Sequence, residues 1–349
     1  MTDSLINRQF NSFFNDVCNG SRSRFFDRVA TMSVTILIAI MALLCAAVPA
    51  HADDNWPNKT VRIIVPFAPG ASNDVIARQL ASQLTKSLGQ SFVVENRPGG
   101  GSTIGAQSVA SSEPTGYTLL FVSSSLATSA AVQKTPYDPI KAFRAVAQVA
   151  SAPFLIITRQ DFPAKTVPEL VTMAKANPGK INFGTSGLGD NTHLATELLA
   201  TTTGIKMTAI SYKGIAPALI DLMAGRTDLI ITSIASIRGT VAENLPKMAF
   251  TSAKRDPDFP NVPTVRDEGI DYIADLWWGV FAPADTPTAI VNKLNVEINK
   301  IVATSEFARF LKNSGALPAS STPSAFQALL TSEVIRWGDT ARRAGLQQK

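Results

Sequence analysis

Two hydrophobic patterns alternate along most of the chain. Short apolar runs rich in β-branched residues are each followed by a turn rich in Gly, Ser or Pro and then by apolar residues at helical spacing. The run Val61–Val65 shows this first, because Ile76, Leu80 and Leu84 then recur every fourth residue until Gly89. The sequence therefore predicts an α/β protein whose parallel sheets are covered by helices on both faces.

The same patterns predict the remaining elements. Further strands are expected at Phe92–Val94, Thr118–Val122, Ile181–Phe183, Met207–Ile210 and Leu229–Ile231. Further helices are expected at residues 103–112, 191–203 and 216–224, and after Thr166, Thr286 and Thr322. Each of these three threonines is a predicted N-cap because a proline follows within two residues, and Thr166 with Glu169 also matches a capping box. Residues 133–150 show no clear pattern and are expected to be loosely structured.

Two blocks of alternating strands and helices predict a two-lobed protein of the periplasmic-binding-protein-like class, with a ligand cleft and a hinge between the lobes. Lobe 1 is expected at residues 53–155 and lobe 2 at 156–275, and residues 276–349 are expected to return to lobe 1 with the C-terminal helices. The apolar stretches Phe154–Ile157 and Leu276–Phe281 are the candidates for strands that cross between the lobes.

Residues 1–52 are expected to be a signal peptide that is removed after export to the periplasm. Arg22, Arg24 and Arg28 form a basic segment, Val34–Val48 is uncharged and apolar, and Ala50-His51-Ala52 offers small residues for cleavage. The alternative is a retained membrane anchor, but about 15 apolar residues fall short of the roughly 20 that span a bilayer as a helix.

Removal of this segment takes away Cys18 and Cys45, so the mature chain would have no cysteine and one histidine, His193. Disulfides, thiolate nucleophiles and Cys-based metal sites are then excluded. A catalytic triad would have to use His193, and the sequence has no Gly-x-Ser-x-Gly motif and no metal-ligand spacing around this residue. The net charge of +5 includes no basic run. We therefore expect no enzymatic activity, no cofactor, no metal and no nucleic-acid partner.

Two turns between a strand and a helix are the main candidates for a ligand site. They run from Phe67 to Asp74 and from Thr185 to His193, and both are rich in glycine and hydroxyl side chains. In open parallel sheets, ligands bind beyond the carboxyl ends of strands, where helix N-termini offer free N–H groups. An ordinary capped connection is the alternative for the first turn. Ser123–Ser125 and Tyr212–Gly214 follow two other predicted strands and would add a polar rim.

Two other features have two interpretations each, and a third has one. His193 is expected either to cap its helix or to line the ligand site. Trp277 and Trp278 are either core residues or a wall of the cleft. The glycine-rich segment at 96–101 is expected only to turn the chain from a strand into a helix.

Several blocks resemble the Bug family, the extracytoplasmic solute receptors of tripartite tricarboxylate transporters. The similarity runs from Trp56 to about Gly345, and its main blocks are Val65–Gly70 with Asp74, Val94–Gly99, Gly116–Leu120, Tyr137–Pro139, Asn182–Gly187 with His193–Ala195, Tyr212–Ala218, and Asp258–Thr264 with the later Trp278. The resemblance implies a periplasmic Venus-flytrap fold, expected to be a monomer, that binds a small carboxylate through main-chain amides, hydroxyl groups and waters. The implied partner is the membrane permease of such a transporter, and the alternative is a membrane sensor kinase.

This chain departs from the family pattern at two places. It has Gly70-Ala71 where relatives usually have two glycines, and Thr232-Ser233 where many relatives have an aspartate. The second departure leads to the hypothesis that the site favours a second carboxyl group or a neutral ring over an amino group. The complete set of predicted ligand-binding residues is Phe67, Ala68, Gly70, Ala71, Ser72, Asn73, Asp74, Ser123, Ser124, Thr185, Ser186, Gly187, Gly189, Asn191, Thr192, His193, Tyr212, Lys213, Thr232 and Trp278.

Overall fold

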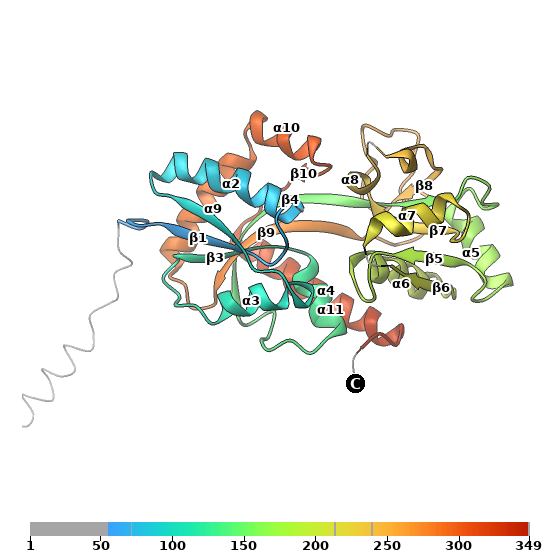
Figure 1. The fold of residues 1–349 in the computed structure, drawn as a ribbon, viewed down its shortest axis with the longest axis horizontal. Coiled ribbons are helices and arrows are strands. Elements are labelled where there is room, and N and C mark those ends of the chain that lie inside the picture. Colours follow the sequence, from blue (N-terminus) through green and yellow to red (C-terminus); the bar gives the residue numbers. More distant parts are fainter. Residues whose placement is uncertain (1–54, 71, 213, 239, 348–349) are drawn as a thin grey trace, which may run out of the picture. The chain divides into compact units, whose positions relative to one another are not determined.

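The computed structural model describes residues 55–70, 72–212, 214–238 and 240–347 (Figure 1). The predicted signal peptide lies outside these residues. Within them, no helix is long and apolar enough to cross a membrane.

Ten strands of the described chain form one sheet with the order β2-β1-β3-β9-β4-β7-β5-β6, and β8 and β10 each pair with β4. β1 pairs in parallel with β2 and β3, and β5 pairs in parallel with β6 and β7. β4 and β9 are antiparallel to each other and join the two parallel groups. The strands are β1 (Val61–Val65), β2 (Phe92–Asn96), β3 (Thr118–Ser123), β4 (Phe143–Thr158), β5 (Asn182–Thr185), β6 (Thr208–Ser211), β7 (Leu229–Ser233), β8 (Lys247–Phe250), β9 (Asp275–Pro283) and β10 (Leu317–Pro318).

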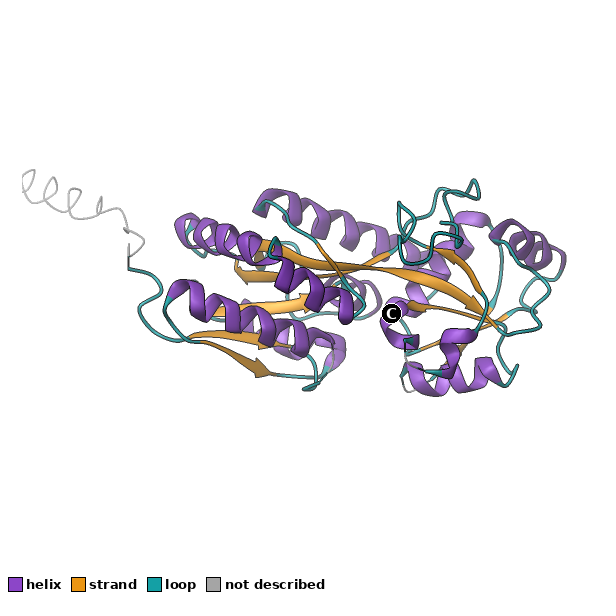
Figure 2. Ribbon diagram, turned by 90° about the horizontal axis from the view of Figure 1, so that it is seen from above, coloured by secondary structure: helices purple, strands orange, loops and turns teal. Residues whose placement is uncertain are grey.

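Helices cover the sheet, as the view in Figure 2 shows. We refer to β1–β3 with α2–α4 and α9–α11 as the first lobe, and to β5–β8 with α5–α8 as the second lobe. The α-helices are α2 (Ser72–Leu88), α3 (Thr103–Ala110), α4 (Ser125–Val132), α5 (Val167–Ala176), α6 (Asn191–Thr203), α7 (Ile215–Met223), α8 (Ile234–Ile237), α9 (Thr288–Val302), α10 (Ser305–Asn313) and α11 (Pro323–Arg343), and the 3₁₀ turns are η1 (Gly100–Ser102) and η2 (Val241–Asn244).

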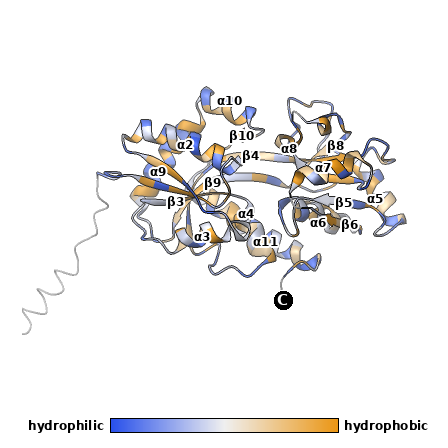
Figure 3. Ribbon diagram, in the orientation of Figure 1, coloured by the Kyte–Doolittle hydropathy of each residue, from blue (hydrophilic) through white to orange (hydrophobic). Residues whose placement is uncertain are grey.

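Most apolar residues of the strands are buried, and they lie on both faces of the sheet. Ile63 and Ile64 of β1 belong to different core clusters, because successive strand residues point to opposite faces. Hydrophobic residues accordingly concentrate in the strands and alternate with hydrophilic residues along the helices (Figure 3). This burial on both faces explains why the parallel strands read as nearly continuous apolar runs.

The predicted α/β class and all six predicted strands are confirmed, but the expectation for residues 133–150 is wrong from Phe143 onward. There the 16-residue strand β4 begins. Its pairing with β9 shifts register between Ala145 and Ala147 and again between Gln148 and Ala150, which interrupts the alternation by which a strand is recognised. The predicted lobe boundaries, after residue 155 within β4 and after 275 at the start of β9, stay predictions.

Two of the three predicted threonine N-caps are confirmed. Thr166 accepts a hydrogen bond from the amide of Glu169, and Thr322 accepts one from the amide of Ala325. The Glu169 carboxylate accepts a hydrogen bond from the amide of Lys165, the residue before the N-cap. The second hydrogen bond of the capping box is therefore shifted by one residue. The prediction for Thr286 is wrong, since Pro287 occupies the N-cap of α9 without any side-chain cap and Thr286 is fully buried.

Candidate functional site

A cavity of about 480 Å³ lies at the starts of α2, α4 and α6. Both predicted turns border it, the first through residues 67, 72 and 73 and the second through residues 188–191. The lining residues are Phe67, Ser72, Asn73, Gly100, Gly101, Ser123, Ser125, Thr128, Ser129, Val132, Gln133, Leu188, Gly189, Asp190, Asn191, Leu276 and Trp278. These residues come from both lobes and from β9 between them.

The two lobes touch at the edge of this cavity. The Thr128 hydroxyl on α4 donates a hydrogen bond of 2.9 Å to the side-chain oxygen of Asn191 at the start of α6. Beside it, Gly189 has a positive φ of 73° and approaches α4 so closely that an added Cβ would lie 2.9 Å from both methyl carbons of Val132. A side chain at Gly189 would therefore force the two lobes apart.

Asp74 shapes the first turn from within. Its carboxylate accepts hydrogen bonds from the Gly70 amide at 2.9 Å and from the Asn96 side chain at 2.9 Å, and it pairs with Arg78. Burial alone would raise the pKa of Asp74, but the hydrogen bonds from Arg78, Gly70 and Asn96 outweigh it, and the pKa is lowered. Asp74 thus fixes the turn that brings Phe67 and Asn73 to the cavity and does not itself line it.

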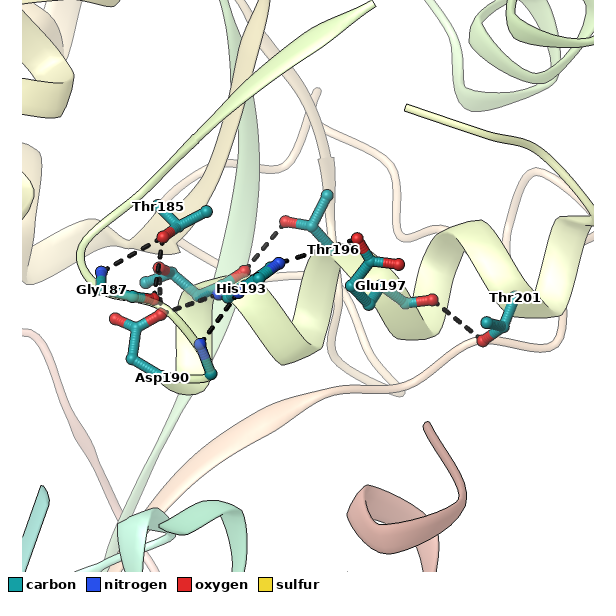
Figure 4. Close-up of polar contacts among 9 residues, drawn as sticks. Thr185, Gly187, Asp190, His193, Thr196, Glu197 and Thr201 are labelled. Atoms are coloured by element: carbon teal, nitrogen blue, oxygen red, sulfur yellow. Dashed lines mark hydrogen bonds and ion pairs between the residues drawn. The ribbon is translucent and has the colours of Figure 1, made fainter. Parts of the chain in front are cut away.

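Asp190 organises the second turn in the same way (Figure 4). As the N-cap of α6 it accepts hydrogen bonds from the His193 amide at 2.9 Å and the Thr192 hydroxyl at 2.8 Å, and a short one from the Ser186 hydroxyl. Burial of the carboxyl group raises the pKa of Asp190 although these hydrogen bonds oppose the effect. Because each oxygen already has a protein donor, the carboxylate is occupied by its own turn.

His193, in the first turn of α6, also holds the second turn in place (Figure 4). Its Nδ1 accepts a hydrogen bond of 2.9 Å from the Gly189 amide, its Nε2 lies 3.7 Å from Glu197, and its side chain is almost completely buried. The accepting Nδ1 leaves Nε2 as the protonated nitrogen of a neutral ring. His193 therefore has the structural role that was one of its two interpretations.

Seven of the predicted site residues line the cavity: Phe67, Ser72, Asn73, Ser123, Gly189, Asn191 and Trp278. Ala71 and Lys213 lie outside the described residues. The others do not line the cavity; they are Ala68, Gly70, Asp74, Ser124, Thr185, Ser186, Gly187, Thr192, His193, Tyr212 and Thr232.

Two of the polar side chains that do not line the cavity have hydrogen-bond partners elsewhere, and Thr232 is a strand residue of the core. The Tyr212 hydroxyl donates to Asp221 at 2.8 Å, and burial together with this carboxylate raises the pKa of Tyr212 to about 12. Thr185 bonds the carbonyl of Gly187 within the turn. Thr232 is buried in β7, where it pairs with Leu155 of β4.

One wall of the cavity comes from α4, a helix that the sequence pattern did not predict. Ser125, Thr128 and Ser129 have helical spacing, and this was the available signal. Ser129 donates to the carbonyl of Gly101, and Gln133 donates to that of Gly100 at 2.7 Å. The glycine-rich segment thus turns the chain, as expected, and also lines the cavity.

Metal-ligating side chains do not gather anywhere in the described part of the chain: no group of three or more His, Cys, Asp or Glu residues is placed to hold an ion. The described cavity lining also contains no Lys, Arg or His. Among the described residues, main-chain N–H groups and helix dipoles are therefore the source of positive potential at its wall.

Two parallel strand groups joined by antiparallel β4 and β9, with a cavity at converging helix starts, define a periplasmic binding protein. A sequence model described as "Tripartite tricarboxylate transporter family receptor" matches residues 76–346, and the chain belongs to this family. The family and its neighbours are binding proteins and not enzymes. Its members bind small carboxylates and work with transporters.

Three similar proteins illustrate this membership. Protein BugT of Bordetella pertussis is 34% identical over 327 residues, which cover 91% of this chain and all of BugT. The solved structure of R. palustris Rpa4515 with adipate is 35% identical, covers 83% of this chain and 98% of its own, and has a TM-score of 0.70. The periplasmic binding protein BugD is 33% identical, covers 84% of this chain and 100% of its own, and has a TM-score of 0.67.

Proposed function

We propose that this protein captures a small carboxylate in the periplasm by closure of its two lobes and delivers it to the membrane permease of a tripartite tricarboxylate-type transporter. The observation that carries the proposal is that two strand-to-helix turns, one from each lobe, border a single cavity. Residues 1–52 would direct export and then be removed.

The chemistry of the cavity favours an anion held by the main chain. The long helices α2 and α6 both begin at its wall, and helix N-termini bind carboxylates through free N–H groups and the positive end of the dipole. Each charge-assisted hydrogen bond contributes roughly 1.5–3 kcal/mol, so several of them can offset the cost of association. The adipate in the Rpa4515 structure supports this ligand class.

The proposal can be tested by isothermal titration of the purified mature protein with succinate, adipate, benzoate and glutamate. We expect micromolar binding of at least one carboxylate and no binding of the matched neutral diamide, because the diamide lacks the charge that the helix starts stabilise. The proposal is wrong if none of the carboxylates binds, or if adipate and adipamide bind with equal affinity. A second test follows uptake of the bound acid in cells with and without the permease.

The contact between Thr128 and Asn191 is expected to favour the closed form. In the variant Thr128→Val the cross-lobe hydrogen bond is lost, and a net hydrogen bond of about 0.5–1.5 kcal/mol corresponds to a roughly twofold to tenfold weaker affinity for the carboxylate. Titration of the variant beside Thr172→Val, which loses an exposed hydrogen bond within α5, checks this expectation. Equal affinity of the two variants would contradict it.

A further inference from the structure

The two lobes touch at a second place, on the edge of β4 that faces away from β9. Residues 150 and 151 of β4 pair with β9 and with β10 at the same time, so these two strands lie on opposite edges of β4. On the β10 edge, Gly315 lies in the turn that leads from α10 of the first lobe into β10, and it packs against Ala235 in α8 of the second lobe. This contact therefore lies beside the strands that cross between the lobes.

The contact has no space for a side chain on Gly315. This glycine has a positive φ of 72°, and an added Cβ would lie 2.5 Å from the Cβ and 2.9 Å from the Cα of Ala235. Two polar contacts flank it: the Arg238 guanidinium donates a hydrogen bond of 3.0 Å to the carbonyl of Lys312 at the end of α10, and the Lys312 ammonium lies 2.9 Å from the carboxylate of Asp258. Because the added atom would meet the backbone of α8, a side-chain rotation cannot relieve the clash.

The cavity lies on the other side of these crossing strands. Its lining includes Leu276 and Trp278 of β9 and Ser123 of β3, which pairs with the edge of β9 that faces away from β4, and none of the described lining residues belongs to β4. Figure 1 shows the same separation, with α8, α10 and β10 above β4 and β9 and with α4 and α6 below them. The crossing strands thus separate the Gly315 contact from the contact between α4 and α6.

Contacts on opposite sides of a hinge respond to lobe motion in opposite ways. When two packed bodies rotate about the strands that join them, a gap that widens on one side narrows on the other. Opening of the cavity within the plane of the sheet therefore presses the Gly315 turn toward α8, where the present spacing already excludes a methyl group. Since packed backbone is hardly compressible, this contact opposes wide opening of the lobes.

We propose that the Gly315 turn, packed against α8 behind the crossing strands, is a stop that limits opening of the lobes and so sets the fraction of closed protein before the solute binds. This inference rests on the proposed function, in which the lobes close around a carboxylate. It adds a place outside the cavity that controls affinity, because the apparent dissociation constant falls as the binding-competent fraction rises.

The experiment compares the wild-type mature protein with Gly315→Ala and with the matched control Gly225→Ala. A methyl group at the stop narrows the permitted opening, so Gly315→Ala is expected to bind adipate about threefold to tenfold more tightly in isothermal titration. Gly225 has the same φ of 72° and no atom within 4 Å of an added Cβ, so its variant shares the backbone strain and should keep the wild-type affinity. A loss of stability alone would not raise affinity.

A second variant and a ligand-free measurement test the same inference. Ala235→Gly removes the Cβ that faces Gly315, so this variant should open wider and bind adipate about twofold to fivefold more weakly. Small-angle X-ray scattering of the ligand-free proteins should give a smaller radius of gyration than wild type for Gly315→Ala and a larger one for Ala235→Gly. The radius of Gly225→Ala should equal that of wild type.

The outcomes separate this inference from the proposed function. If wild type binds none of succinate, adipate, benzoate and glutamate, the proposed ligand class fails and scattering alone decides about the stop. If wild type binds one of these acids, which then serves as the probe, but Gly315→Ala binds it no more tightly or has a radius of gyration no smaller than wild type, only the stop is overturned. Where Gly315→Ala does not fold, an affinity and a radius of Ala235→Gly equal to those of wild type overturn it.

Discussion

The variant Gly189→Ala is expected to bind its carboxylate about tenfold to 100-fold more weakly than the wild type. The added Cβ would lie 2.9 Å from both methyl carbons of Val132, so the second turn could not reach α4 without a shift, and such overpacking typically costs 1–3 kcal/mol. Because Gly189 and Val132 lie in different lobes, the clash destabilises the closed form. The affinity for the carboxylate falls as a result. The positive φ of 73° would also lower the free energy of unfolding by about 1–2 kcal/mol.

Two further variants separate the clash from other effects. Gly187→Ala lies in the same turn, but its φ is not positive and the nearest atom to an added Cβ is 3.8 Å away, so its affinity should stay close to wild type. In the double variant Gly189→Ala, Val132→Ala the two methyl carbons at 2.9 Å are absent, but the Cβ of residue 132 still lies 3.0 Å from the added Cβ, so affinity should return in part. Isothermal titration measures all three. If the double variant binds no more tightly than Gly189→Ala, the effect of that substitution comes from the backbone conformation and not from contact with the Val132 methyl groups.

The second large effect concerns Asp275, where we expect Asp275→Asn to become more stable than the wild type as the pH rises. Burial, reinforced by the nearby Glu333 and opposed by Arg336, raises the pKa of Asp275 to about 7. One of its oxygens is buried without a hydrogen-bond partner. An acid with a folded pKa near 7 and an unfolded pKa near 4 destabilises the folded state by at most about 4 kcal/mol once it is ionised.

The sign of this effect follows from proton linkage. Between about pH 4 and pH 7 the folded protein holds a proton at Asp275 that the unfolded chain releases, so this group's contribution to stability is complete below pH 4 and is lost as the pH approaches 7. The asparagine side chain does not ionise, so at this position the variant Asp275→Asn loses no stability as the pH rises. The difference between variant and wild type in the free energy of unfolding should therefore grow from near zero at pH 4 toward its maximum above pH 7.

Urea unfolding at pH 4, 5.5, 7 and 8 checks this expectation. Asp271→Asn is the matched control, because that side chain is 92% exposed and its loss should leave the pH dependence parallel to wild type. Burial also raises the pKa of Glu333 and of Asp190, so wild-type stability alone cannot isolate Asp275. A difference that stays constant across the pH range would refute the assignment.

Much of the fold could be predicted from periodicity and turn chemistry. β1 and α2 have strong local patterns, and Thr166 and Thr322 mark their helices through side-chain caps. α4 was missed because its small polar residues pack against a neighbouring loop and the cavity and produce no apolar stripe. β4 was recognised only in its last residues, since its pairing is irregular where Arg144 and Gln148 interrupt the apolar run.

The two turns at the candidate site were predicted, but the direction of each side chain was not. Asp74, His193 and Thr185 have residue types suited to a ligand, yet each one bonds its own turn. A polar side chain can bind the ligand or form a hydrogen bond with the nearby backbone. Which of the two it does depends on tertiary contacts, and these cannot be read from the neighbouring residues in the sequence. For the same reason the sequence did not predict Gly100 and Gly101 as lining residues, whose carbonyl groups accept hydrogen bonds from Gln133 and Ser129 of the cavity wall.

The pairing of β4 bears on how this protein could be dissected or rebuilt. One part of the strand bonds β9 and β10, and its last five residues bond β7 and β8, so a single backbone segment is shared by both halves. A fragment cut near residue 153 would expose unpaired strand edges on either side, which favours aggregation. Chimaeras that exchange halves between relatives are thus poorly suited to this scaffold, and a fluorescent reporter is better inserted into a surface turn that leaves β4 intact.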